Sequence, residues 1–233
     1  MKIMAVIPAR GGSKGIPRKN LRKIGSHSLL VNRILEARKS ICSDVFVSTE
    51  DKEIAEEAIA SGAQIIRRPE GLSQDETSTD AVLLHAVEEI QLKDDDVLVL
   101  LQATSPFLSF KRINLCIEEL IKRPTANSAI TLRIGHPFMW TLDEDTYEPN
   151  GHTRDKRPRR QELGVEGWET GGCYAIRVSA LKSQKVRYPS PTLGISVNHL
   201  EALDIDTQED LDLATNIMQS MESFNNTTGG NRG

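Results

Sequence analysis

Ile3-Met-Ala-Val-Ile7 and the loop that follows it, Pro8-Ala-Arg-Gly-Gly-Ser-Lys-Gly-Ile-Pro-Arg-Lys-Asn20, decide the fold of this chain and point to its site. The apolar run predicts a short buried strand. The loop combines three glycines, which let backbone N–H groups approach a ligand closely, with four cations: Arg10, Lys14, Arg18 and Lys19. Such a loop at the carboxyl end of a strand suits a polyphosphate. The alternative is a solvated basic turn after an edge strand.

Two common phosphate-binding motifs do not fit this loop. A Walker loop places four residues between a glycine and Gly-Lys-Ser/Thr, and Ser13-Lys14 does not stand in that frame. A dinucleotide fingerprint needs Gly-x-Gly-x-x-Gly, and Gly12 and Gly15 do not make that pattern. The sequence therefore excludes both motifs.

Predicted strands and helices alternate along the chain. The hydrophobic pattern predicts strands at 44–48, 64–66, 96–101 and 128–133, and helices at 29–37, 51–61, 79–91 (capped by Ser78 or Thr79) and 109–122. This order is typical of an α/β fold with a doubly wound, mostly parallel, Rossmann-like sheet in three layers. We expect one domain over residues 1–221.

Ligands of such sheets bind beyond the carboxyl ends of the strands. Most of the candidate chemistry falls at these expected ends: 8–10, 48–50, 102–105 and 204–206. Asp204 and Asp206 alternate in a segment expected to be extended, so their carboxylates would share one face. Two acids in a phosphate site suit Mg²⁺. The alternative is that Asp206 caps the helix that Thr207 opens.

The composition limits the classes of function that this chain can have. The 233 residues carry a formal net charge of −4, which argues against nonspecific nucleic-acid binding. Three widely spaced cysteines are typical of buried thiols in a reducing compartment. With no apolar run of membrane-spanning length, we expect a cytoplasmic protein. The five histidines lack metal-ligand spacing, and no Gly-x-Ser-x-Gly nucleophile motif occurs.

Two segments interrupt the pattern. Residues 136–170 combine aromatic residues, an acidic turn and a basic run (154–160) without clear periodicity, which indicates an inserted loop or small sheet. The basic run is either a cationic clamp for an anion or a solvated charged face. Residues 222–233 are polar and rich in glycine, so we expect a disordered tail.

Residues 7–20 resemble the first motif of the CMP-sialic acid synthetase family, Ile-Pro-Ala-Arg-Gly-Gly-Ser-Lys-Gly-Ile/Leu-Pro-x-Lys-Asn. Four further motifs follow in the family's order, so the resemblance spans residue 7 to about residue 214. It implies that nucleotide contacts come from Arg10, Gly11, Gly12, Ser13, Lys14, Lys19, Asn20, Arg68, Thr77 and Thr79. The catalytic group would comprise Arg10, Lys14, Lys19 and Asp206, and the metal ligands Asp204 and Asp206.

The resemblance assigns the sugar contacts to Gln102, Thr104, Ser105, Arg160, Gln161, Thr170, Gly171 and Tyr174. Here the chain departs from the family at three places. Thr170 stands where asparagine is usual, Trp168 where some members have a cation, and Met139 where some have a lysine. We therefore expect the nucleotide-binding part of the site to match the family and the sugar-binding part to differ from it.

The family's reaction joins CTP and a nonulosonic acid, such as N-acylneuraminate, into a CMP-sugar and pyrophosphate, with Mg²⁺ (or Mn²⁺) as the cofactor. The resemblance implies a homodimer in which the 136–170 segment helps to close the neighbouring site. No nucleic acid or membrane partner is expected. One alternative is the same reaction on legionaminic, pseudaminic or deaminated sialic acid. Another is a nucleotide-binding module without activity.

Overall fold

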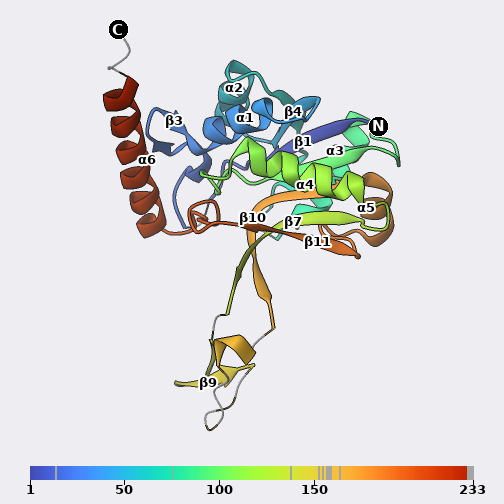
Figure 1. Cartoon of the computed structure of the whole chain (residues 1–233). Helices are drawn as coiled ribbons and strands as arrows, with labels where there is room; N and C mark the ends of the chain where they lie inside the picture. The colour runs from blue at the N-terminus through green and yellow to red at the C-terminus, as the bar shows by residue number, and fades with distance from the viewer. Residues whose placement is uncertain are drawn as a thin grey trace.

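A seven-stranded sheet forms the centre of the computed structural model, which describes residues 1–13, 15–74, 76–136, 138–151, 153, 155, 159–162 and 164–229 (Figure 1). Its strand order is β11-β7-β10-β6-β1-β4-β5. The strands are β1 (Ile3–Pro8), β4 (Asp44–Thr49), β5 (Gln64–Arg67), β6 (Val97–Leu101), β7 (Ser128–Gly135), β10 (Glu166–Arg177) and β11 (Thr192–Val197). All neighbouring pairs are parallel except the two made by β10. The expected mostly parallel sheet is confirmed.

Helices cover both faces of the sheet. They are α1 (Leu29–Lys39), α2 (Lys52–Ala60), α3 (Thr79–Ile90), α4 (Phe110–Lys122), α5 (Val178–Gln184) and α6 (Gln208–Gly229), with short 3₁₀ turns η1 (Lys19–Leu21), η2 (Glu70–Leu72) and η3 (Arg160–Glu162). Ser78 caps α3, because its hydroxyl accepts a hydrogen bond from Ala81 N at 3.2 Å. The boundaries predicted from the hydrophobic pattern differ from these by a few residues.

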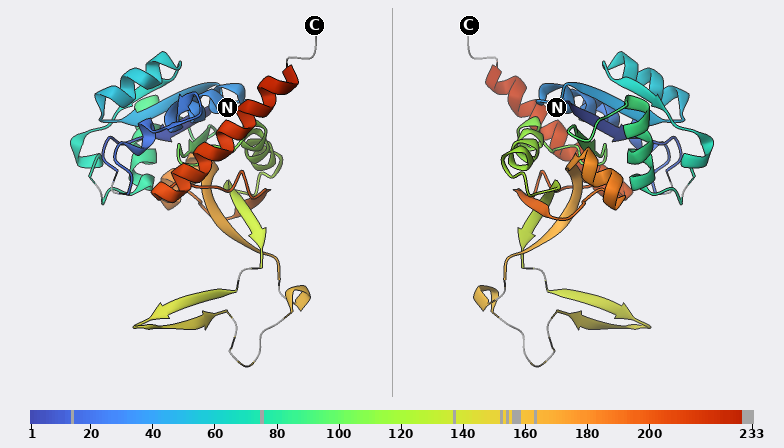
Figure 2. Two further views of the ribbon diagram at one scale, coloured as in Figure 1. Left: turned by 90° about the vertical axis from the view of Figure 1, so that its left-hand side faces the viewer. Right: turned by 90° about the vertical axis from the view of Figure 1, so that its right-hand side faces the viewer.

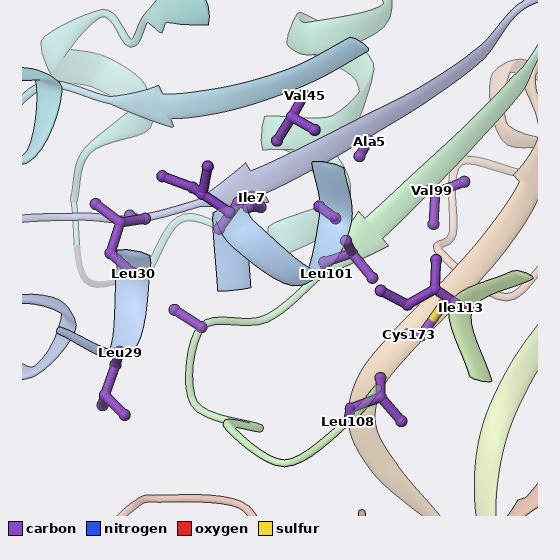
Figure 3. Packing of buried hydrophobic residues seen from close by; sticks show 14 of the residues in the cluster. Ala5, Ile7, Leu29, Leu30, Val45, Val99, Leu101, Leu108, Ile113 and Cys173 are labelled. Atoms are coloured by element: carbon purple, nitrogen blue, oxygen red, sulfur yellow. The ribbon is translucent and has the colours of Figure 1, made fainter. Parts of the chain in front are cut away.

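Two hydrophobic clusters fill the space between the sheet and the helices on its two faces. The larger one packs α1, α2, α4 and α6 against one face of the sheet, and Figure 3 shows Ile7, Val99 and Leu101 meeting Leu30 and Ile113. The smaller one packs α3 and α5 against the other face through Leu83, Val87 and Leu181. Strand β6 is buried along its whole length, as its continuous apolar sequence predicts. The three-layer expectation is therefore confirmed.

An arm leaves the body between β7 and β10 (Figure 2). It carries the hairpin β8 (Met139–Asp143) and β9 (Thr146–Asn150), in which Met139 faces Asn150. The chain returns from the arm as β10, which runs antiparallel to β7 and pairs with it, so no crossover helix is needed between these two strands. The segment expected to be a loop or small sheet is a small sheet on extended stalks.

Helix α6 crosses the end of the body and runs to Gly229, so residues 222–229 are helical and not the disordered tail expected from composition. Glu222 connects this helix to the body, because its carboxylate accepts hydrogen bonds from Ser26 N and Oγ, beside the small hairpin β2 (Lys23–Ile24) and β3 (His27–Ser28). Residues 230–233 lie outside the described part of the chain. No helix in the described ranges is long and apolar enough to cross a membrane.

Candidate active site

A pocket of about 430 Å³ opens at the carboxyl ends of β1, β5 and β6. Its walls come from five separate stretches of sequence: the loop after β1, the segment between β5 and α3, the first turn of α3, the turn after β6, and the segment before α6. It is lined by Pro8, Arg10, Ser13, Gly15, Lys19, Asn20, Arg68, Leu72, Gln74, Thr77, Thr79, Val82, Gln102, Ala103, Thr104 and Asp206. The structure thus brings together ten of the residues expected to form the site.

The loop after β1 is held by the turn after β4. Gly11 N donates a hydrogen bond to Glu50 Oε1 at 2.8 Å, and Arg18 forms a salt bridge with Asp51 at 2.5 Å. The hydrogen bond from Arg18 lowers the pKa of Asp51, which also caps α2 through Ile54 N. Asn20 Nδ2 donates to Arg10 O, which closes the loop on itself. Sequence reasoning missed Glu50 and Asp51 as supports, because two acids at a strand end also suit an ordinary helix start.

Gly15 lets the loop approach the segment before α6. A Cβ at this position would lie 2.8 Å from the carbonyl oxygen of Asp206, a backbone atom that cannot move independently. A Cβ on Gly12 would meet no atom within 4 Å. Of these two glycines, only Gly15 must lack a side chain for the loop to approach the segment before α6.

We predict that Gly15→Ala lowers kcat/KM for CTP by about 100-fold, the effect expected when catalytic groups move by about 1 Å. Gly71→Ala is the control and should stay close to wild type, because a Cβ at Gly71, which is not among the expected substrate contacts, would meet no atom within 4 Å. Steady-state kinetics and thermal melting of both variants check this. Equal losses in the two variants would contradict the assignment of close approach to Gly15.

Cations line one side of the pocket. Burial lowers the pKa of Arg68, an effect that the Glu50 carboxylate opposes and the Arg10 cation adds to. Arg68 also donates to Ser48 O at 2.7 Å, which fixes its guanidinium beside the end of β4. Arg10 and Arg68 thus place two positive charges where an anionic ligand would sit. Lys14 lies outside the described residues.

Lys19 connects the loop to the acidic segment before α6. Its Nζ donates to Ile205 O at 2.8 Å and to Asp206 Oδ1 at 3.1 Å. Ile205 is fully buried, and its N–H donates to Thr104 O at 2.9 Å. The segment is therefore anchored to the turn after β6. It follows no strand, so the expectation that it forms a strand end is wrong.

The two acids differ in environment. Burial raises the pKa of Asp204, and the negative charge of Asp206 adds to this, while Thr104 and Lys19 oppose it. Asp206 is exposed. It does not cap α6, since Thr207 and Asp210 form that cap: Thr207 N donates to Asp210 Oδ2 at 2.8 Å, and Asp210 N to Thr207 Oγ1 at 3.2 Å. The alternative role of Asp206 is excluded.

A buried arginine supports the turn after β6. Arg33 of α1 is fully buried and donates to Leu108 O at 2.9 Å and to Ser105 O at 2.5 Å. Burial lowers its pKa to about 10. Sequence reasoning missed Arg33, although its spacing from Leu30 and Ala37 places it on the apolar face of the helix.

The structure places several expected sugar contacts elsewhere. Ser105 is buried beneath its turn, Thr170 Oγ1 bonds Thr131 Oγ1 inside the sheet, and Tyr174 is buried against the α3 side. Gln161 is exposed on the arm, and only the backbone of Arg160 is described. Gly171, by contrast, lies at the pocket edge, where a Cβ would stand 3.5 Å from Gln102 Oε1 and 3.7 Å from Asp204 Oδ2.

Comparison with known proteins agrees with this arrangement. The model of the cytidylyltransferase family matches residues 4–227. N-acylneuraminate cytidylyltransferase A of Danio rerio is 36% identical over 74% of this chain, and this chain spans only 40% of that protein's length. The CMP-N,N'-diacetyllegionaminic acid synthase of Legionella pneumophila is 30% identical, with 94% of this chain and 97% of that protein covered.

The fold matches a solved structure as well. A CMP:2-keto-3-deoxy-manno-octonic acid synthetase complexed with CTP superposes with a TM-score of 0.70 at 18% identity, covering 95% of this chain and all of that one. At that identity, the likeness concerns the fold alone. The match of the family model over nearly the whole chain carries the assignment: the chain belongs to the cytidylyltransferase family.

Proposed function

We propose that this protein transfers the cytidylyl group of CTP to a nonulosonic acid, releasing pyrophosphate. The observation that carries the proposal is one pocket, in which a glycine-rich cationic loop meets Gln102, Thr104 and Asp206. The names of the relatives support it, since those of Danio rerio and Legionella pneumophila act on N-acylneuraminate and on a legionaminic acid. N-acylneuraminate is the substrate we propose first, with legionaminic, pseudaminic and deaminated sialic acids as the alternative.

The chain's own residues suit an in-line displacement at the α-phosphorus of CTP. Arg10, Ser13 and the loop N–H groups would hold the triphosphate, and Lys19 would neutralise charge near the reacting phosphate. Arg68, Thr77 and Thr79 would line the base and ribose side. Gln102 and Thr104 would orient the sugar hydroxyl for attack. Positioning and electrostatics then supply most of the catalysis.

Asp204 and Asp206 fit Mg²⁺, with Mn²⁺ as a possible substitute. Asp204 Oδ1 is buried and has no hydrogen-bond partner among the described residues, so a cation would satisfy it. Over the same residues, no group of three or more His, Cys, Asp or Glu could hold a metal by itself. Two carboxylates completed by substrate phosphates are a common Mg²⁺ arrangement. The bound ion would polarise the phosphoryl oxygens and favour deprotonation of the sugar hydroxyl.

The test is pyrophosphate release from CTP and Mg²⁺, with and without N-acetylneuraminic acid, and the product mass. Sugar-dependent release together with a CMP-sugar product supports the proposal. Release only with a related nonulosonic acid would keep the reaction class and change the substrate. Tight CTP binding without release for any sugar would favour the inactive nucleotide-binding module.

We also propose a cytoplasmic homodimer built through the arm. The three cysteines are free thiols, which suits a reducing compartment. The arm extends away from the body (Figure 2). Its exposed side chains include the large apolar residues Met139, Leu142 and Val165. Large apolar side chains exposed together on one projecting segment are typical of an interaction site. A second copy would cover it and bring the arm toward the neighbouring pocket.

Leu142→Glu is expected to convert the dimer to a monomer of 25.9 kDa and to lower kcat/KM for the sugar acid. Leu142 is 57% exposed on β8 opposite Tyr147, so the added charge would be buried only in the assembly. Leu213→Glu, at a similarly exposed site on α6, is the control. Size-exclusion chromatography with light scattering measures the molar mass of each variant. A Leu142→Glu protein that remains a dimer would contradict the proposal that the arm forms the dimer interface.

A further inference from the structure

One cation lies in the core of the molecule, next to the turn that follows β6. Arg33 of α1 is fully buried, and its two hydrogen bonds in the described part of the chain go to backbone carbonyl oxygens, Leu108 O at 2.9 Å and Ser105 O at 2.5 Å. A buried cation is costly unless it is paired and hydrogen-bonded, and apolar side chains of similar size often replace buried charges without loss of stability. Packing alone therefore does not account for an arginine at this position.

Glu36, three residues further along α1, binds the same stretch of chain. Its Oε2 accepts a hydrogen bond from Phe110 N at 2.8 Å, at the first residue of α4. Burial lowers the pKa of Arg33 to about 10, and the negative charge of Glu36 opposes this effect, so Arg33 keeps its proton at neutral pH. Within residues 105–110, the cation thus holds carbonyl oxygens and the carboxylate holds an N–H group. We call Arg33 and Glu36 the α1 pair.

The turn that the α1 pair holds carries part of the pocket wall. Gln102 and Thr104 line the pocket, and Thr104 O accepts a hydrogen bond from Ile205 N at 2.9 Å. Ile205 stands between the two acids of the segment before α6. A shift of this turn would therefore move two pocket-lining side chains and the attachment point of the acidic segment together.

Helix α1 is itself fixed to the loop after β1. The hairpin of β2 and β3 joins the two, and Leu29 N, at the first residue of α1, donates to Arg22 O at 3.0 Å. Ser28 caps the helix, since its Oγ accepts a hydrogen bond from Val31 N at 3.1 Å. Helix α1 therefore connects two walls of the pocket: the loop after β1 and, through the α1 pair, the turn after β6.

We propose that Arg33 and Glu36 are positioning residues for the sugar-binding part of the site. They hold the turn after β6 in the place from which Gln102 and Thr104 orient the sugar hydroxyl. The inference rests on the proposed function and deepens it. Neither member of the α1 pair contacts a substrate, because both act through the backbone of residues 105–110.

The test replaces Arg33 with methionine, which fills a similar volume without a hydrogen-bond donor, and measures kcat and both KM values. Arg33→Met is expected to lower kcat by about 100-fold, the loss that follows a misplacement of about 1 Å near reacting groups, while KM for CTP changes by less than about twofold. Arg33→Lys should recover about tenfold of this loss, the value of one hydrogen bond from a charged donor. Glu36→Leu should lower kcat in the same direction.

Arg177→Met is the matched control, because Arg177 also donates to backbone carbonyl oxygens, Ala126 O and Leu120 O, both at 2.8 Å. Arg177 pairs with Val97 at the first residue of β6, at the end of this strand opposite the pocket. Its replacement should lower the melting temperature and leave kcat unchanged. Equal losses of kcat in Arg33→Met and Arg177→Met, or a raised KM for CTP with unchanged kcat, would indicate a general structural role and overturn the proposal.

Hydrogen exchange followed by mass spectrometry separates this proposal from the proposed function. Residues 102–110 should exchange faster in Arg33→Met than in the wild type, and Arg177→Met should not change them. Unchanged exchange there in both Arg33→Met and Glu36→Leu would overturn the proposal, whatever the activity. If the wild type makes no CMP-sugar, the proposed function fails, and the exchange still decides whether the α1 pair holds the turn. Should Arg33→Met not fold, Arg33→Lys and Glu36→Leu carry both measurements.

Discussion

Asp206→Asn is expected to lower kcat by a factor on the order of 10² to 10³ while leaving the fold and thermal stability unchanged, since this is the effect of losing one group that stabilises transition-state charge. Asp206 is exposed and lines the pocket, and its carboxylate accepts a hydrogen bond from Lys19. Its side chain takes no part in the cap of α6, which Thr207 and Asp210 supply, although its backbone N–H donates to Asp210 Oδ2. The loss should therefore appear in turnover and not in melting temperature.

The measurement is kcat as a function of Mg²⁺ concentration, with circular dichroism as the folding check. Asp212→Asn is the control, because Asp212 is exposed on α6, the helix that follows Asp206, and accepts a hydrogen bond from Gln208 Nε2 at 2.7 Å. Removal of the metal with EDTA should abolish wild-type turnover, and added Mg²⁺ should restore it. An Asp206→Asn enzyme with normal turnover at every Mg²⁺ concentration would contradict the metal assignment.

Lys19→Ala is the second change with a large expected effect, again on the order of 10² to 10³ in kcat. The ammonium group holds the loop after β1 against the segment before α6, through Ile205 O and Asp206 Oδ1. Its removal loosens this connection and takes away the positive charge that we propose lies beside the reacting phosphate. Neither effect touches the hydrophobic core.

Steady-state kinetics with CTP and sugar varied separately would separate the two effects. Loss of charge near the transition state lowers kcat, whereas a displaced loop also raises KM for CTP. Lys23→Ala, at an exposed position on β2, is the matched control. A Lys19→Ala protein with normal circular dichroism and an undiminished rate would overturn the role of Lys19.

Much of the site could be predicted because its chemistry is concentrated at the ends of strands. The apolar run of β1 and the glycines after it identify both an element and a ligand type within one short stretch. Parallel strands then bring Arg10, Arg68 and Gln102 to one edge of the sheet, although they are far apart in sequence. Strand order and one loop were enough to predict that these residues line one pocket.

The supporting residues could not be predicted in the same way. Arg33 and Glu50 act through contacts with residues distant in sequence: Arg33 donates to Leu108 O and Ser105 O, and Glu50 accepts from Gly11 N. A buried arginine on a helix or an acid after a strand has several ordinary roles. Only the tertiary arrangement selects between them.

The sugar side is where expectation and structure differ. Tyr174 and Thr170 lie on β10, where a register shift between Glu169 and Tyr174 decides which side chains face the pocket. A motif gives the residue types but not the position of such an irregularity. As a result, Gly171 reaches the pocket while Thr170 and Tyr174 turn into the sheet.

The most direct test of the proposed reaction follows the oxygen of the sugar hydroxyl. N-acetylneuraminic acid carrying ¹⁸O at its anomeric hydroxyl would be incubated with the enzyme, CTP and Mg²⁺, and the products analysed by mass spectrometry. Attack of this hydroxyl on the α-phosphorus predicts ¹⁸O in the CMP-sugar and none in pyrophosphate. Label in pyrophosphate, or CMP formed without a sugar adduct, would contradict cytidylyl transfer in this pocket.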